Sequence, residues 1–227
     1  PSQTVNVSTV GNIARSTVVQ DVPFLLESAP SVVATSETGT GIGYTGMRVR
    51  GIEIARMNVT IDGVPLNDAE SQDIYWVNMG DFSSSVDKVD LQRGVGSSTT
   101  GASSFGASMN VETKDNSAEP YMQVSGAIGS YKTRKMSVAL GTGLLADHLM
   151  FDARLSMMKT DGWIQRSKDK LQSIDVSGSY IWKHSVLTAK FMAGKQKTGI
   201  TWEGLPEDKL DVDLTYNPAG MYLDDEG

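Results

Sequence analysis

Five segments in the second half of the chain alternate apolar with small or polar residues, which is the pattern of β-strands with one apolar face. They occupy residues 121–129, 136–144, 149–157, 173–182 and 187–194. Each is close to the roughly 9–11 residues that a tilted strand needs to cross the hydrocarbon core of a bilayer. The pattern therefore predicts consecutive antiparallel strands of an amphipathic sheet.

The connections between these strands differ in length. Residues 145–148 and 183–185 form short turns, whereas residues 161–171 and the acidic tail 198–227 are long and polar. In an up-and-down sheet the short and long connections fall on opposite sides, as they do in bacterial outer-membrane barrels. A soluble antiparallel sandwich also alternates, so alternation alone leaves both architectures open. The Ser, Gly, Thr and Ala residues of the polar face slightly favour a barrel lumen.

The first 115 residues follow another pattern. Short alternating runs predict strands, a mainly apolar run predicts a short helix at 18–26, and Gly/Ser/Thr-rich stretches predict loops at 35–46 and 94–104. The predicted strands are 47–50, 59–62, 89–92 and 109–113, with a turn at Asp62-Gly63. Short strands joined by long loops indicate a small mixed α+β domain whose loops carry function.

Composition excludes several classes of protein. The net charge is −7, so the basic surface of a nucleic-acid-binding protein is absent. There is no cysteine, and the two histidines, His148 and His184, fall in predicted turns. No apolar run reaches the roughly 18 residues of a transmembrane helix. We find no nucleophile–base pair, acid pair or metal cluster in the sequence, and therefore expect neither an enzyme nor a metal site.

Four motifs in the first part occur in a fixed order. They are Met47–Gly51, Val59–Asp68, Val86–Gly94 and Gly101–Val111. Together they resemble the plug signature of TonB-dependent receptors, and the resemblance extends over roughly residues 5–200 of the chain. The runs 67–72 and 75–78 look most like ferric-citrate-type receptors of Bacteroidetes.

The resemblance implies a barrel of about 22 strands that is stoppered by a globular plug. It divides the chain into a plug domain at 1–117 and the first about five barrel strands at 118–227. Such a protein lies in the bacterial outer membrane, contacts its lipid, and imports an iron chelate (ferric citrate or another siderophore) with energy from TonB. Iron then enters only as chelated substrate, and no cofactor is expected. The rival hypotheses are another cargo (cobalamin, haem, peptide or glycan) and a non-transporting binding or adhesion protein.

Two features depart from the family pattern. Five strands cannot close such a barrel, so we expect the natural chain to continue past Gly227. The segment Val5–Val7 could extend a sheet edge but does not match the TonB box, which we expect upstream of Pro1.

The resemblance also suggests where ligand is contacted. Gly41–Gly46 matches G-x-G-x-x-G, but a strand rather than a helix is predicted after it, which argues against a dinucleotide site. We expect Asp68 and Glu70 to be turn or capping residues. The candidate ligand contacts on plug loops are Thr40, Tyr44, Gln72, Tyr75, Trp76, Ser98 and Thr99.

Cations supply the remaining candidates. Arg154 and Lys190 fall on lumen-facing positions and are predicted anion partners, unless they pair internally with Asp152 or Asp175. Arg48, Arg50 and Arg93 are predicted to lock the plug by pairing with barrel carboxylates, because a buried guanidinium needs a counter-charge.

Overall fold

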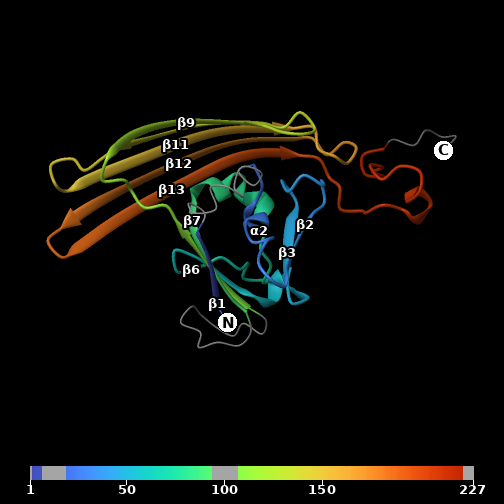
Figure 1. The fold of residues 1–227 in the computed structure, drawn as a ribbon, viewed down its shortest axis with the longest axis horizontal. Helices are drawn as coiled ribbons and strands as arrows, with labels where there is room; N and C mark the ends of the chain where they lie inside the picture. The colour runs from blue at the N-terminus through green and yellow to red at the C-terminus, as the bar shows by residue number, and fades with distance from the viewer. Residues whose placement is uncertain (1, 7–18, 94–106, 222–227) are drawn as a thin grey trace.

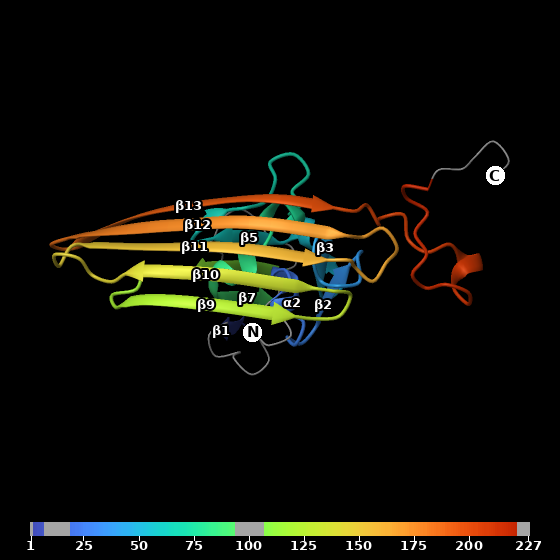
Figure 2. The ribbon, with the colours of Figure 1, turned by 90° about the horizontal axis from the view of Figure 1, so that it is seen from above.

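The computed structural model describes residues 2–6, 19–93 and 107–221. A long five-stranded sheet arches over a smaller domain, and the chain then runs beyond one end of the sheet (Figures 1 and 2). The small domain, formed by the described residues up to 113, contains the first strands, and the N-terminus lies on its side away from the long sheet (Figure 1). The predicted combination of a mixed α+β domain with antiparallel barrel-type strands is confirmed.

The small domain is built on two sheets. The larger has the order β1-β7-β8-β5-β6, in which β5 and β8 are parallel and the other neighbours antiparallel. Its strands are β1 (Ser2–Asn6), β5 (Asn58–Ile61), β6 (Val64–Pro65), β7 (Val86–Arg93) and β8 (Ala107–Thr113). The smaller sheet consists of β2 (Val32–Ser36), β3 (Thr45–Val49) and β4 (Ile52–Glu53). The helices of the small domain are short: α2 (Val22–Leu25), η1 (Ile54–Arg56), η2 (Trp76–Met79) and η3 (Phe82–Ser85).

Alternating apolar residues on the strands form the core of the small domain. Val89 and Leu91 on β7 lie opposite Val111 and Met109 on β8, and all four side chains are almost fully buried. Removing a side chain of this size from water stabilises a fold by roughly 1.5–3 kcal/mol. Asp62-Gly63, with positive φ angles of 48° and 81°, forms the tight β5–β6 turn that the sequence predicts.

The predicted helix at 18–26 is shorter in the structure. α2 has four residues, with Pro23 in its first turn, and ends at Leu26. A proline is well placed there because its missing N–H would have no helical partner. Residues 7–18 lie outside the described part of the chain.

The long sheet, here called the wall sheet, is an antiparallel meander with the order β13-β12-β11-β10-β9. Its strands are β9 (Pro120–Ile128), β10 (Arg134–Thr142), β11 (Leu149–Thr160), β12 (Asp169–Trp182) and β13 (Ser185–Thr198). All five predicted strands are therefore present, and β12 extends into the segment predicted as loop at 161–171.

The two faces of the wall sheet differ in polarity. Met122, Leu155 and Leu187 belong to a set of exposed apolar side chains on the face turned away from the small domain. The small domain lies against the opposite, polar face (Figure 1). In a soluble sandwich the second layer would cover the apolar face instead, so that alternative is wrong.

The ends of the wall sheet also differ. Residues 129–133 and 161–168 and the segment after β13 lie at one end, called the outer end (Figure 2). The short connections 143–148 and 183–184 lie at the other, inner end. The segment after β13 carries η4 (Glu207–Lys209). None of the described helices is long and apolar enough to cross a membrane.

Candidate functional site

The contact between the small domain and the wall sheet centres on Asp81. This carboxylate accepts a hydrogen bond from Arg154 at 2.5 Å and also forms an ion pair with Lys135. Both cations belong to the wall sheet. The side chains of Asp81 and Lys135 are only 1% and 3% exposed. Ser84 donates to Asp81 at 2.7 Å, and Ser173 donates from β12 at 3.3 Å. A single carboxylate of the small domain thus binds three strands of the wall sheet.

Local backbone geometry aims Asp81 at the wall sheet. Asp81 has φ 60° and ψ 15° at the N-terminal boundary of η3, a left-handed conformation that aspartate tolerates better than most residues. Burial alone raises the pKa of Asp81, but the charges of Lys135 and Arg154 outweigh it, and the pKa lies below its usual value. Asp81 is therefore an anion at neutral pH.

A second ion pair lies further along the wall sheet. Lys190 of β13 lies 3.2 Å from Asp62 and also donates to Thr113. Burial raises the pKa of Asp62, and the hydrogen bonds from Thr113 and Lys190 lower it by more. The Asp62-Gly63 turn is therefore also a docking point on β13.

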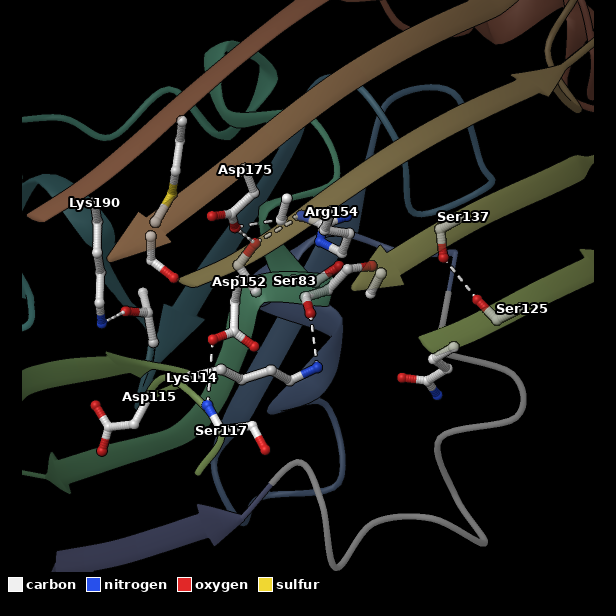
Figure 3. A pocket seen from close by; sticks show the side chains of 18 of the residues that line it. Ser83, Lys114, Asp115, Ser117, Ser125, Ser137, Asp152, Arg154, Asp175 and Lys190 are labelled. Atoms are coloured by element: carbon white, nitrogen blue, oxygen red, sulfur yellow. Dashed lines mark hydrogen bonds and ion pairs between the residues drawn. The ribbon is translucent and has the colours of Figure 1, made fainter. Parts of the chain in front are cut away.

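A cavity of about 580 Å³ lies between these contacts, lined by the small domain and all five wall strands, mostly with polar residues (Figure 3). Asp152 accepts hydrogen bonds from the side-chain amide of Asn116 at 2.7 Å and from the backbone N–H of Ser117 at 3.2 Å. The hydroxyl of Ser85 donates a hydrogen bond to Asp175. Serine and charged side chains thus dominate this contact.

Lys114 differs from the other cations of this cavity. Lys135, Arg154 and Lys190 bind carboxylates, whereas Lys114 donates to the carbonyl oxygen of Ser84 at 2.9 Å. Burial, followed by the charges of Arg154 and Lys135, lowers the pKa of Lys114. Among the described residues that line this cavity, its ammonium is the cation that forms no ion pair with a carboxylate.

At the outer end, the β2–β3 loop lies against the wall sheet. Trp163 covers Gly39, whose φ of +72° and close neighbour leave no room for a side chain. The rings of Tyr44 and Trp202 meet edge to face at 5.3 Å. Ile42 is buried with Met158 and Leu171 of the wall sheet, which forms a small apolar contact.

A buried carboxylate supports this loop. Asp21 accepts the hydroxyl of Thr45 at 2.9 Å, and its own N–H donates to Gly41 at 2.8 Å. Burial, with smaller contributions from the charges of Asp169 and Asp81, raises the pKa of Asp21 to about 7. Asp169 of β12 approaches the same loop, 3.3 Å from the position of a Cβ on Gly43.

The structure separates the predicted ligand contacts into different environments. Gln72 and Tyr75 are exposed, and Thr40 and Tyr44 are partly buried in the β2–β3 loop. Trp76 is 2% exposed and belongs to the hydrophobic core of the small domain. The prediction for Trp76 is therefore wrong, because its ring faces the core. Ser98 and Thr99 lie outside the described residues.

The predicted cations are also placed differently. Arg154 and Lys190 do project from the lumen-facing side, but carboxylates of the small domain bind both, so they are not open anion partners. Arg48 pairs at 2.9 Å with Glu53 on the neighbouring strand, on an exposed face, and not with a carboxylate of the wall sheet. Arg50 is exposed. The side chain of Arg93 lies outside the described part of the structure.

Sequence reasoning missed Asp81, Lys135 and Lys114. The alternation of β10 does place Lys135 on the lumen side, since Met136 faces outward. Nothing comparable marked Asp81, which lies between two 3-10 helices. Asp68, in contrast, caps its own turn by accepting the N–H groups of Glu70 and Ser71, as predicted.

Comparison with known proteins agrees with this architecture. Residues 1–108 match the family described as the TonB-dependent Receptor Plug Domain. Among curated proteins, no relative matches the sequence.

Solved structures share the fold over most of the chain. The unliganded ferric citrate transporter FecA is 17% identical with a TM-score of 0.75, over 96% of this chain and 34% of that one. The closed ferric-catecholate import receptor Fiu from E. coli K12 is 16% identical with a TM-score of 0.68, over 87% and 26%. The ferric yersiniabactin uptake receptor FyuA from Yersinia pestis is 15% identical with a TM-score of 0.63, over 86% and 31%. The chain thus spans about a quarter to a third of the length of these proteins.

A globular domain on the polar face of a sheet whose other face is apolar defines a barrel wall with a plug in its lumen. With the family match, residues 1–108 are identified as a TonB-dependent receptor plug domain, and the strands that follow share the fold of outer-membrane receptors with such a plug. The small domain is called the plug from here on. The family consists of transport receptors and not of enzymes.

Proposed function

We propose that the protein imports an iron chelate across the outer membrane with energy from TonB. The observation that carries the proposal is that the plug lies against the polar, lumen-facing side of the wall sheet and is held there by ion pairs. η2 follows the loop of Gln72 and Tyr75 and, with Gly194 and Thr198 of β13, lines a cavity of about 240 Å³. The similar ferric-chelate receptors support iron as the cargo.

An anionic chelate such as ferric citrate is the favoured cargo within this proposal. Among the described cations of the plug–wall cavity, Lys135, Arg154 and Lys190 form ion pairs with carboxylates, whereas Lys114 forms none and donates to a carbonyl oxygen. A cation in that position can attract an anion during passage, because opposite charges interact strongly where water is scarce. Iron would be cargo, so the proposal requires no resident cofactor.

Calorimetry on the full-length protein in detergent tests the cargo. The ligands would be ferric citrate, one ferric catecholate, one ferric hydroxamate and cobalamin. We expect tight binding of one iron chelate, and uptake of radioactive iron from it only in cells that contain TonB. Binding of cobalamin alone, or of no compound, would contradict iron import and point to another cargo on the same architecture.

A loop variant tests the place of contact. The side chain of Tyr75 is 49% exposed and its hydroxyl donates to Ser71 in the same loop, so Tyr75→Ala leaves the plug core intact. We expect its affinity for the chelate to fall about tenfold, the effect of a contact worth roughly 1.4 kcal/mol. Val33→Ala removes another exposed plug side chain (58% exposed) and is the control. Equal affinities of the two variants would contradict the contact.

A further inference from the structure

A row of basic residues crosses four strands of the wall sheet at its outer end. Arg134 on β10 lies opposite Lys159 on β11, which lies opposite Lys170 on β12, which lies opposite Lys197 on β13. These four residues are called the basic row. Ile128 of β9 continues the row beyond Arg134 and is 90% exposed.

The basic row lies on the outward face of the wall sheet. All four side chains are exposed, whereas their chain neighbours Lys135, Met158 and Leu171 are buried against the plug. Two residues further toward the inner end, the same face carries Met136 and Met157, and the apolar band begins there. The basic row therefore marks the outer border of the membrane-facing surface.

No member of the basic row forms an ion pair with a carboxylate among the described residues, although the charge of Lys159 acts on Asp161 at longer range. The nearby carboxylate of Asp161 lies 3.1 Å from the ammonium of Lys132 in the neighbouring loop. Asp169 lies on the lumen side and accepts a hydrogen bond from the amide of Gln196. Among the described residues, the ion pairs involve no member of the row. Like charges directly opposite each other on a sheet are destabilising. An anion that lies against the row offsets this repulsion.

The surface around the basic row can hold more than an ion. The row, Lys195 and the outward methionines line a groove of about 580 Å³. Lysine stems lie along apolar surface while their ammonium groups reach toward water and headgroups. One surface thus combines apolar and cationic groups at the height where the hydrocarbon of the outer leaflet ends.

We propose that the basic row binds the phosphate groups of an anionic glycolipid in the outer leaflet. The ammonium groups and the guanidinium of Arg134 bind phosphate oxygens through charge-assisted hydrogen bonds. The first carbons of the acyl chains lie on Met136 and Met157. The lipid neutralises the row and fixes the height of the wall sheet in the bilayer.

Native mass spectrometry of the delipidated full-length protein in neutral detergent tests this site. The probes are a bisphosphorylated lipid A and the same lipid without phosphates. The row variant K159Q/K170Q/K197Q is compared with R56Q/K183Q/K209Q, which loses the same charge elsewhere. A surface cation contributes roughly a tenfold factor or slightly less to binding of anionic lipid, so we expect affinity to fall about 100-fold in the row variant and to be unchanged in the control.

The expected binding also weakens with added salt, since exposed charges are screened. Equal affinity of the row variant and the wild type, or of the two lipids, would overturn the proposal. So would competition by inorganic phosphate at the concentration of the lipid, because the site would then be a simple anion site.

Discussion

The plug and the wall sheet use the same alternation of apolar and polar residues with opposite results. In the plug, Leu91 and Met109 face a core that water does not reach. In the wall sheet, Leu155 and Leu187 are 57% and 73% exposed, and Lys135 and Asp152 face the lumen. The plug buries its apolar residues in itself, whereas the wall sheet turns them to lipid.

This comparison explains the character of the contact between the two parts. The apolar residues of the plug face its own core, and those of the wall sheet face outward. Polar groups of the two parts therefore face each other. The apolar contacts lie at the β2–β3 loop, such as that of Ile42 with Met158 and Leu171 and that of Trp163 with Gly39. Elsewhere the contact consists mainly of ion pairs and hydrogen bonds.

The strongest way to break the comparison is to remove the largest core side chain of the plug. Trp76→Ala creates a cavity in the plug core, and such changes cost about 3–5 kcal/mol. Phe151→Ala removes an aromatic ring from the lipid-facing side of the wall, where it is 46% exposed. Hydrogen exchange of the full-length protein should show lost protection of plug amides in the first variant only. Comparable losses in both would show that the two regions bury apolar surface alike.

A smaller effect is expected where the plug meets the wall sheet. Asp81→Asn leaves Lys135 without its buried counter-charge, although Arg154 keeps Asp175 at 3.7 Å. Breaking a buried pair costs about 3 kcal/mol or more. Limited proteolysis should cut the plug of this variant faster, with the wall sheet intact.

The control for this prediction is Glu53→Gln, which breaks the exposed pair with Arg48. Exposed pairs contribute at most about 1 kcal/mol. Equal proteolysis of the Asp81 variant and the wild type would mean that Asp81 does not hold the plug.

The smallest effect depends on pH. The folded-state pKa of Asp21, about 7, lies above the value of about 3.9 expected in an unfolded chain. The folded state therefore keeps this proton longer, and the stabilisation is complete below pH about 4 and lost as the pH rises to about 7. Each unit corresponds to about 1.4 kcal/mol. Because water entering the site offsets part of this difference, we expect about 2 kcal/mol.

Hydrogen exchange of the β2–β3 loop, compared between wild type and Asp21→Asn at each pH, measures this contribution. The wild type should gain protection relative to the variant as the pH falls from 7.5 to 5. Parallel behaviour of the two proteins over that range would show that Asp21 is ionised throughout.

Much of the fold could be predicted because it depends on local pattern. The alternation from Leu149 to Met157 predicts β11, and Asp62-Gly63 predicts the β5–β6 turn. The extension of β12 to Asp169 could not be predicted, since polar residues at its start alternate between lumen and exterior as loop residues also would.

The candidate site was less predictable because it depends on how two separate units dock. Arg48 occupies a polar position on β3, and the sequence does not reveal whether that face meets the wall or water. Trp76 lies in an aromatic loop segment, where an exposed contact and a core residue look alike. The role of Asp81 becomes visible only through its contacts with Lys135 and Arg154, which are 54 and 73 residues away in the sequence.

The polar contact between plug and wall has a mechanical consequence. Separating two packed apolar surfaces exposes both to water in one step, and the resisting force rises with the apolar area exposed. A hydrogen bond such as that between Ser117 and Asp152, in contrast, can be exchanged singly for one to water at a net cost of about 1 kcal/mol. The hydrogen-bonded part of this contact can therefore separate in small steps, one bond at a time, rather than in a single step.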